Sequence, residues 1–403
     1  MRKTRGVVSA FLAAIVSVSV FAVGCKANSK TEVTDLVDCG ILHEQEFGGV
    51  YIKSTIEEFN ALGFSYGDSV TVSFSNGYEL ADVPYYNGYY TKTGEPLLIA
   101  YPGYDYIKAA INNGDDLWDV AGLPSVTNEE NDLFGQSANP EEEITATVSL
   151  YEKGKYLDIQ SARDIRYFDD RTLYASDEVF ANFRALKGGD LKEDLIYRSA
   201  SPCDDQHGRA KYVDSLIEKA GVKYIIDLAD NDAKISGYMN KEGFASDYFA
   251  TLFDPADTEG DSVAALALNM NFGSDYFKGQ FVKALVAIAE NDGPFLIHCT
   301  EGKDRTGFVC AFIEAFAGAT YAEIVEDYMM TYFNYYAITK AFDPNRYDVI
   351  VGSVLNPMLE VFTGENVDFA SADLVALAES FLTDNGMTGE QINAMRNKIL
   401  KSA

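Results

Sequence analysis

A cysteine and an arginine stand six positions apart in the segment 298–307, which reads HCTEGKDRTG. The preceding run FLIH at 295–298 is apolar enough for a buried parallel strand, and 307–316 has the apolar density of a core helix. The segment therefore joins a strand end to a helix start, where backbone N–H groups converge and the helix dipole favours an anion. Such a loop is suited to holding a phosphate group.

Each polar residue type in this loop has a chemical use around a phosphate. Cys299 is the candidate nucleophile, because a thiolate beside N–H donors and a guanidinium can attack phosphorus. Arg305 is the candidate phosphate ligand, since its planar fork matches two phosphoryl oxygens and stabilises the charge of the transition state. Thr306 can hydrogen-bond the sulfur and assist its departure, and His298 orders the loop. The predicted phosphate cradle is completed by Thr300, Glu301, Gly302, Lys303 and Asp304.

With these residues in place, the segment resembles the signature of cysteine-dependent tyrosine and dual-specificity phosphatases. The version GKDRTG at 302–307 resembles the bacterial branch that includes tyrosine phosphatases with phosphoinositide activity. The segments 196–202, 222–228 and 327–336 resemble elements that flank the signature in that branch. The resemblance implies an α/β fold with a central, mostly parallel sheet flanked by helices, and hydrolysis through a phosphocysteine intermediate.

The flanking segments contribute further candidate residues. The resemblance implies supporting roles for Arg198 and Asp227, and a core ion pair is the favoured role for Arg198 over lining the entrance. Ala229 departs from the arginine that related sequences often carry after Asp-Leu, which puts that arginine's substrate contact in doubt. Lys303 adds a cation inside the loop, which suits a substrate with more than one phosphate.

The general acid has three candidates. Resemblance to the Lys-Asp-Arg branch favours Asp304, which lies inside the loop. Asp254 and Asp257 are the alternatives, because they stand in a turn-like, proline-bearing segment a few tens of residues before the cysteine. Each also has a structural role open to it, since Asp304 can brace Arg305 or Lys303 and loop aspartates commonly act as caps.

The N-terminus predicts export. Residues 1–5 are basic, 6–23 are apolar or small and uncharged, and Cys25 follows small residues. This order is typical of a lipoprotein signal, with Cys25 as the lipidated residue; an ordinary secretory signal is the alternative. The expected location is therefore the outer face of a bacterial cytoplasmic membrane, with membrane contact through the lipid only.

The composition narrows the classes of molecule that the protein can bind. The chain has 62 acidic and 32 basic residues, a formal net charge of −30, which argues against nucleic-acid binding. Salt screens charges over about 8 Å, so the local field of the loop can still attract an anion. No cysteine and histidine cluster has metal-ligand spacing, so neither metal nor cofactor is expected. A disulfide between Cys39 and Cys203 is left open.

Composition also predicts the domain organisation, because Tyr, Gly and β-branched residues dominate before about residue 161 and strands alternate with helices after about residue 180. The expected divisions are a signal peptide (1–24), a polar tether (25–43), a mainly β accessory domain (44–161), a connector (162–178) and a catalytic domain (179–403).

The accessory domain has clear strand signals. Residues 69–74 alternate, Asn76-Gly77 is a hairpin signal, and 96–101 and 144–150 are further strands. Segments at 47–50, 66–68 and 94–97 resemble the β-barrel-like C-terminal part of S-adenosylmethionine hydroxide adenosyltransferases, which implies the fold without the activity. In the catalytic domain, helices are expected at 212–220, 275–290, 306–317, 320–333, 371–383 and 388–400, with capping boxes at Thr320-Glu323 and Thr388-Gln391.

Three functions compete. The favoured one is a phosphomonoesterase acting on phosphotyrosine, phosphoinositides or inositol phosphates. The second is sulfur transfer of the rhodanese kind, which also uses a loop cysteine, although Arg305-Thr306-Gly307 favours the first. The third is a surface binding module with a vestigial phosphatase site.

The signal sequence generates a prediction about anchoring. Cys25→Ala removes the only thiol in the signal-like segment that can accept lipid, so the protein is expected to leave the membrane fraction or to stay unprocessed. Mass spectrometry of the membrane-extracted N-terminus checks this. An unmodified Cys25 in the wild-type protein would contradict the anchor.

Overall fold

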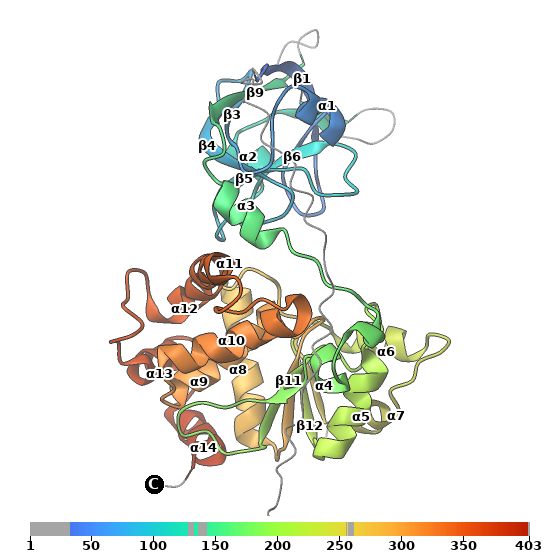
Figure 1. The fold of residues 1–403 in the computed structure, drawn as a ribbon, viewed down its shortest axis with the longest axis vertical. Helices are drawn as coiled ribbons and strands as arrows, with labels where there is room; N and C mark the ends of the chain where they lie inside the picture. The colour runs from blue at the N-terminus through green and yellow to red at the C-terminus, as the bar shows by residue number, and fades with distance from the viewer. Residues whose placement is uncertain (1–32, 128–132, 136–142, 255, 257–261, 402–403) are drawn as a thin grey trace, which may run out of the picture.

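The structure is a computed structural model that describes residues 33–127, 133–135, 143–254, 256 and 262–401. A β-rich part and a larger α/β part lie one above the other, and the chain passes between them through helix α3 (Leu157–Arg163) (Figure 1). The lipidation candidate Cys25 and the acid candidate Asp257 lie outside the described residues.

The N-terminal part is a barrel-like sheet. In the described residues its strand order is β2-β6-β5-β4-β3-β9-β1-β8-β7, and β1 also pairs with β2, so the pairings from β2 round to β1 close into a ring. Alternate residues of a strand face the same side, and Val70, Val72 and Phe74 of β3 are all buried in its core. The strands are β1 (Leu36–His43), β2 (Val50–Ile52), β3 (Ser69–Phe74), β4 (Glu79–Tyr86), β5 (Pro96–Ile99), β6 (Ile107–Ile111), β7 (Ser125–Thr127), β8 (Leu133–Gly135) and β9 (Thr145–Glu152).

The turn between β3 and β4 follows the sequence signal. Gly77 has φ +95°, and the Asn76 side-chain oxygen accepts a hydrogen bond from the Tyr78 N–H. Short helices α1 (Ile56–Ala61) and α2 (Leu117–Val120) complete this part.

The expected tether is too long. Residues 36–43 form β1, which pairs with β2, β8 and β9. Asp38 and Gly40 interrupt the alternation of this strand, and the ladder shifts register between Leu36 and Cys39. Because an irregular strand lacks a clean period of two, its sequence does not separate it from a polar linker.

The C-terminal part contains the predicted central sheet, which confirms the α/β fold. Its order is β10-β11-β14-β12-β13, with only the short β10 antiparallel to its neighbour. The central strands β12 and β14 are mostly apolar because both faces of the sheet are covered, whereas β11 carries Arg198 and Ser199. The strands are β10 (Arg184–Ala185), β11 (Ile196–Ser199), β12 (Tyr224–Asp227), β13 (Val263–Ala265) and β14 (Phe295–His298).

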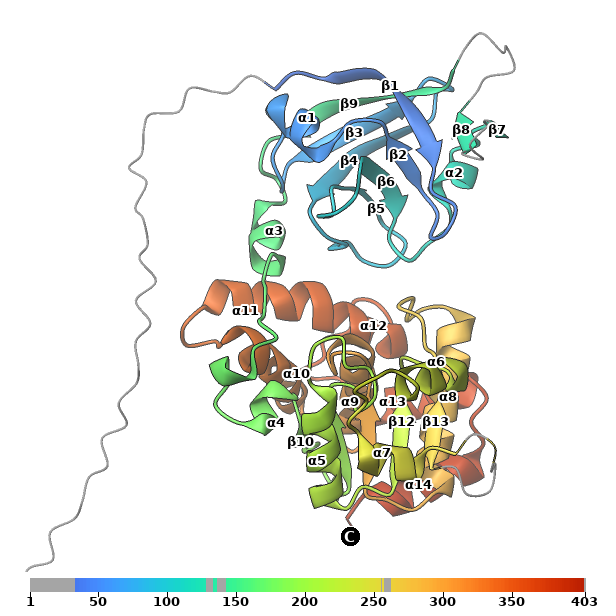
Figure 2. The ribbon, with the colours of Figure 1, turned by 90° about the vertical axis from the view of Figure 1, so that its right-hand side faces the viewer.

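Helices cover both faces of this sheet (Figure 2). Ile225 and Leu296 pack into a cluster with residues of α5 and α7, whereas Ile226 and Ile297 pack with residues of α8 and α9. The helices of the first group are α4 (Asp177–Phe180), α5 (Ala210–Ala220), α6 (Asp232–Met239) and α7 (Asp247–Leu252). Those of the second are α8 (Asp275–Glu290), α9 (Asp304–Phe316), α10 (Tyr321–Tyr336), α11 (Pro344–Ile350), α12 (Asn356–Thr363), α13 (Leu374–Asp384) and α14 (Gly389–Ile399).

Local capping signals were accurate. Thr320 and Glu323 form a capping box at the start of α10, and Thr388 and Gln391 form one at α14. The helices α11 and α12, with a π-helical turn at Val351–Leu355 between them, were not anticipated.

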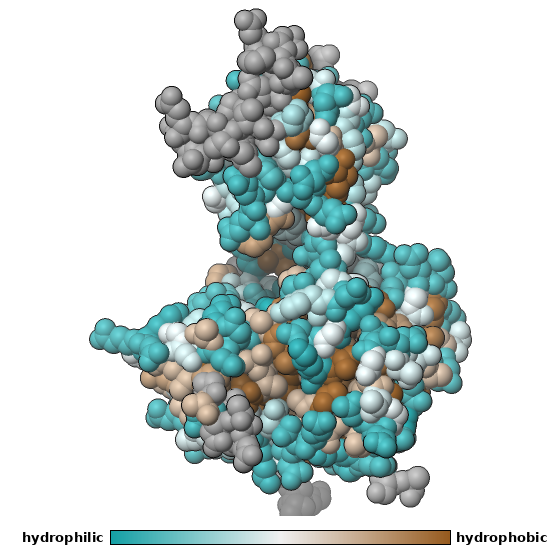
Figure 3. All heavy atoms as spheres, turned by 180° about the vertical axis from the view of Figure 1, so that it is seen from behind, coloured by the Kyte–Doolittle hydropathy of each residue, from teal (hydrophilic) through white to brown (hydrophobic). Residues whose placement is uncertain are grey.

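The two parts contact each other beside α3. The Arg346 guanidinium of α11 donates to the Ser161 carbonyl oxygen of α3 (3.1 Å), and Lys92 of the barrel pairs with Glu360 of α12 (3.0 Å). The face of the molecule seen in Figure 3 is largely hydrophilic, with scattered apolar patches. Among the described residues, no helix is both long and apolar enough to cross a bilayer.

Candidate active site

The phosphate loop, defined here as residues 299–305, follows β14 and runs into the first turn of α9. Cys299 is almost fully buried at its start, with 3% of its surface exposed. Gly302 has φ +67°, and a Cβ there would lie 2.2 Å from the Ser199 carbonyl oxygen. Only glycine fits this position, because both the left-handed backbone and the close approach to β11 exclude a side chain.

Arg305 is anchored at the carboxyl edge of the sheet. One terminal nitrogen donates to the Leu268 carbonyl oxygen (3.1 Å) and the other to the Thr300 hydroxyl (3.4 Å). Its buried Nε has no hydrogen-bond partner among the described residues. Because a guanidinium carries five donor hydrogens, this anchoring leaves donors free for phosphoryl oxygens. The next residue, Thr306, also keeps its buried hydroxyl unpaired within the described structure.

A buried ion-pair network holds the loop from behind. Arg198 is fully buried, donates to the Gly302 carbonyl oxygen (2.9 Å) and pairs with Asp327 of α10 (2.5 Å). The Asn182 amide donates to the same carbonyl (3.1 Å), and Arg184 pairs with Asp327 (2.7 Å). The favoured structural role of Arg198 thus matches its position in the fold.

Mutual attraction dominates the electrostatics of the Arg198–Asp327 pair, whereas burial prevails at Arg184 and lowers the pKa of its guanidinium. Burial acts to raise the pKa of Asp327, but the Arg184 and Arg198 guanidinium groups outweigh it and hold that pKa below the usual value. Burial likewise acts to lower the pKa of Arg198, and the Asp327 carboxylate raises it. All three groups therefore stay charged at neutral pH.

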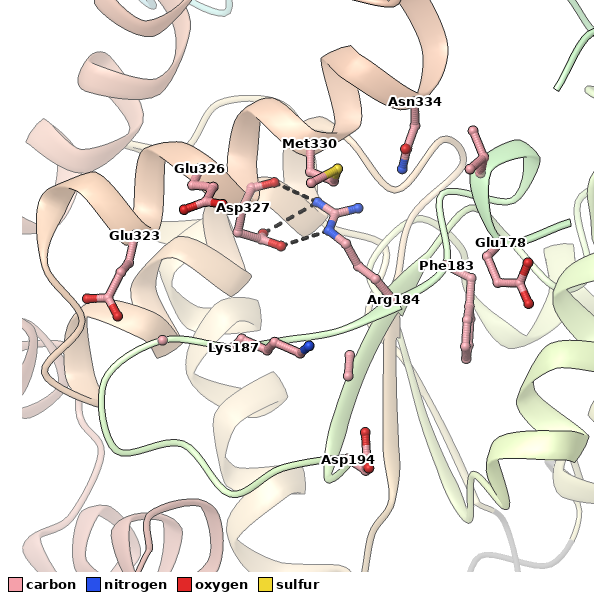
Figure 4. A pocket seen from close by; sticks show the side chains of 13 residues that line it. Glu178, Phe183, Arg184, Lys187, Asp194, Glu323, Glu326, Asp327, Met330 and Asn334 are labelled. Atoms are coloured by element: carbon pink, nitrogen blue, oxygen red, sulfur yellow. Dashed lines mark hydrogen bonds and ion pairs between the residues drawn. The ribbon is translucent and has the colours of Figure 1, made fainter. Parts of the chain in front are cut away.

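A surface pocket of about 600 Å³ opens on the outer side of this network (Figure 4). Arg184 and Asp327, joined by their ion pair, line one part of it, with Glu323, Glu326 and Lys187 around them. Since Cys299 does not line this pocket, the hollow lies behind the phosphate loop and is separate from the reactive side.

An aromatic wall stands beside the phosphate loop. The Tyr167 hydroxyl donates to the Glu301 carboxylate (2.6 Å), and the Tyr335 hydroxyl donates to the Glu301 carbonyl oxygen (2.7 Å). The Tyr167 ring stacks on Tyr335 at 5.2 Å and meets Tyr336 edge-on at 5.7 Å. This wall offers a flat apolar surface next to the loop.

Lys303 sits among acidic and aromatic groups at the start of α9. Its ammonium lies 3.3 Å from Glu301 and 3.7 Å from Asp304. Burial alone would lower the pKa of Lys303, but the Asp304 and Glu301 carboxylates raise it well above its usual value. Burial acts to raise the pKa of Glu301, and Lys303 with the Tyr167 hydroxyl reverses that effect and lowers it.

The N-terminal part reaches this side of the loop. The Arg163 guanidinium at the end of α3 lies 4.9 Å from the centre of the Tyr90 ring. Burial raises the pKa of Tyr90, and the positive charges of Arg163 and Lys303 act against it. Arg163 also acts on Tyr332 of α10. Tyr90 of the barrel, Arg163 of the connecting helix and Lys303 of the phosphate loop are therefore near enough to influence one another electrostatically.

The acid candidates are placed very differently. Asp304 is the first residue of α9, and 31% of its side chain is exposed beside Lys303. Asp254 is exposed just after α7, near the point where the Ser262 N–H bonds to the Leu252 carbonyl oxygen at the amino edge of the sheet. The loop lies at the carboxyl edge, so Asp304 lies at the same edge of the sheet as Cys299, and Asp254 lies at the opposite edge.

Several functional positions escaped sequence reasoning. Asn182 and Asp327 brace the loop although they are separated from it by many residues, and Tyr167 falls in the expected connector. Asp327 stands in a segment that resembles the helix after the signature, so its role had a sequence signal. Tyr167 had none, because an isolated tyrosine in a linker carries no periodic pattern.

The comparisons with known proteins give the family. The model of the tyrosine phosphatase family matches residues 180–401, more than half of the chain. The chain belongs to the tyrosine phosphatase family. A tyrosine-protein phosphatase from Nostoc commune is 46% identical over 43 residues, which are 11% of this chain and only 15% of that protein.

Two solved structures also match the chain. The core catalytic domain of the PP-IP phosphatase SIW14 from S. cerevisiae, in complex with citrate, is 20% identical, and the match covers 42% of this chain and 84% of that one with a TM-score of 0.25. The Siw14 catalytic core is 15% identical, with 50% and 94% covered and a TM-score of 0.26.

The buried ion-pair network behind the phosphate loop yields a stability prediction. Asp327→Asn is expected to lower the free energy of unfolding by about 3–5 kcal/mol, because it leaves Arg198 buried without a counter-charge. Urea unfolding of the full chain measures the change. The folded pKa of Asp327 is depressed, so its contribution is present above the unfolded carboxyl pKa and is lost as pH falls through the folded pKa. The free energies of unfolding of the variant and the wild type should therefore converge at acid pH.

The matched control is Asp348→Asn, which removes a carboxylate from an exposed pair with Lys340. Its expected effect is within about 0.5 kcal/mol, as for other exposed pairs. A loss below about 1 kcal/mol for Asp327→Asn at neutral pH would show that the network does not hold the fold.

Proposed function

We propose that this protein is a cysteine-dependent phosphomonoesterase that works through a phosphocysteine intermediate. The observation that carries the proposal is the position of Cys299 at the carboxyl end of β14, directly before the loop whose Arg305 keeps free donors. Backbone N–H groups at the start of α9 supply the remaining phosphate donors, with the helix dipole favouring the anion.

The reaction has two displacements at phosphorus. The Cys299 thiolate attacks phosphorus, the P–O bond to the leaving group breaks, and Asp304 gives its proton to the departing oxygen. Water then attacks the phosphocysteine, the P–S bond breaks, and the Asp304 carboxylate takes the proton from that water. Arg305 holds the equatorial oxygens in both steps, and the free Thr306 hydroxyl stabilises the departing thiolate.

The surroundings of the loop favour phosphotyrosine as the substrate. The wall formed by Tyr167, Tyr335 and Tyr336 gives an aryl ring a surface to pack against beside the phosphate site. Arg163 and Lys303 add cationic groups on the same side, which suits substrates with a further phosphate, such as inositol phosphates or phosphoinositides. A metal-free panel of phosphotyrosine peptides, phosphoserine peptides and inositol phosphates ranks these substrates.

The proposed place of action is outside the cytoplasmic membrane. It rests on the basic, apolar and small-residue order of 1–24 followed by Cys25. The active-site side of the catalytic domain would then act on phosphorylated groups in the extracytoplasmic space.

The nucleophile is tested by Cys299→Ser. We expect activity below roughly a hundredth of wild type, because the covalent step loses its thiolate, while phosphate-ester binding persists on the unchanged loop and Arg305. Steady-state kinetics with an aryl phosphate and calorimetric binding of a phosphotyrosine peptide measure the two effects.

Two companion variants sharpen this test. Cys39→Ser removes a half-buried thiol of the barrel and should leave turnover unchanged. Arg305→Lys should weaken both binding and turnover, since a point charge replaces a planar fork. The assignment of Cys299 as the nucleophile would be overturned if Cys299→Ser kept more than roughly a hundredth of the wild-type activity while Cys39→Ser was inactive.

The general acid is tested by the dependence on the leaving group. Asp304→Asn should slow hydrolysis of alkyl phosphates severely and of an activated aryl phosphate much less, because only a poor leaving group needs the proton. Asp254→Asn, at the opposite edge of the sheet, should change neither rate. An equal loss on both substrates for Asp304→Asn would indicate damage to the phosphate loop instead.

A further inference from the structure

A buried cluster of metal-type ligands lies behind the catalytic cysteine. The side-chain donors of Cys203, Asp227 and Asp230 all lie within 4.8 Å of one another. The three residues are 2%, 0% and 0% exposed. They come from the loop after β11, the end of β12 and the segment before α6, so the fold gathers them at the carboxyl edge of the sheet.

In each aspartate one carboxylate oxygen has hydrogen-bond or ion-pair partners and the other has no hydrogen-bond partner among the described residues. Oδ1 of Asp227 accepts from the backbone N–H groups of Ala229 and Asp230. Oδ1 of Asp230 is paired with the Lys234 ammonium (2.7 Å) and accepts from the Tyr238 hydroxyl (3.4 Å). Both Oδ2 atoms are buried with no hydrogen-bond partner among the described residues. Carboxylates that ligate a metal show this division, with one oxygen oriented by outer partners.

A fourth group points at the same place. His298 is fully buried, and neither of its ring nitrogens has a hydrogen-bond partner in the described part of the chain. Its Nε2 lies 3.7 Å from the unpaired Oδ2 of Asp227. This distance is too long for a hydrogen bond, so the pair is open to a shared third partner.

The charge and the donor atoms of these residues indicate which ion can occupy the site. Two buried carboxylates and a thiol face one lysine, and uncompensated carboxylates are costly away from water. Sulfur and imidazole donors disfavour Mg²⁺ and Ca²⁺, which prefer oxygen ligands, whereas Zn²⁺ accepts thiolate, imidazole and carboxylate together. We propose that Cys203, Asp227 and Asp230 bind one Zn²⁺ ion, and that the unpaired Nε2 of His298 faces the same ion.

The site ties the catalytic loop to the neighbouring strand. Asp227 lies opposite His298 in the parallel ladder, and the Leu228 N–H donates to the His298 carbonyl oxygen (2.9 Å). A metal ion at Asp227 would fix the end of β12 against the residue that precedes Cys299. Its role is to stabilise the fold, and it takes no part in phosphate transfer.

The test uses the full chain carrying Cys299→Ser, so that the reactive thiol does not bind metal. After treatment with a chelator, the protein is titrated with zinc sulfate, and bound zinc is counted after gel filtration. We expect one ion per chain, and a rise in Tm of roughly 5–10 °C at free zinc a hundredfold above Kd. Because Cys299 is already replaced, the outcome is independent of the proposed phosphatase activity.

Variants identify the ligands. Adding Cys203→Ser or Asp230→Asn should abolish the stoichiometric zinc and the Tm rise, whereas adding Cys39→Ser should change neither. Cobalt substitution gives a second readout, because a thiolate–cobalt charge-transfer band should appear in the parent and in Cys39→Ser and vanish in Cys203→Ser, even at equal folded content. Zinc binding that survives Cys203→Ser, or a parent that binds no zinc, would overturn the proposal.

Discussion

The Gly302 carbonyl oxygen is the point on which the active site depends. It accepts from Arg198 and Asn182, so one backbone group of the phosphate loop is fixed by two buried side chains. Arg198 is itself held by Asp327, which also binds Arg184. A loop that must turn its N–H groups inward presents its carbonyls outward, and buried carbonyls need donors. The network supplies those donors.

This arrangement also explains how an acidic protein can hold a phosphate. The chain has a formal charge of −30, yet the residues behind the loop are arginines and the group within it is Lys303. Glu301 and Asp304 lie beside that lysine and keep its pKa high. Because salt screens the distant acidic surface, the field at Cys299 is set by these neighbours.

The phosphatase domain does not form its surroundings alone. Tyr167 reaches the phosphate loop from the stretch that was expected to be a plain connector, and Arg163 comes from the helix that follows the barrel. These residues lie on the side where the aromatic wall stands. The segment that joins the barrel to the catalytic domain therefore contributes a hydrogen bond and a positive charge on this side of the phosphate loop.

The sequence by itself determined the local features. The strand-loop-helix around Cys299, the capping boxes of α10 and α14 and the parallel α/β class follow from patterns within about twenty residues. The irregular strand β1 and the helices α11 and α12 lacked such patterns. Only the tertiary structure placed Asp254 at the opposite edge of the sheet from the loop, and only it showed which distant residues brace the loop. It also gathered Cys203, Asp227, Asp230 and His298, whose separation along the chain hides their proximity.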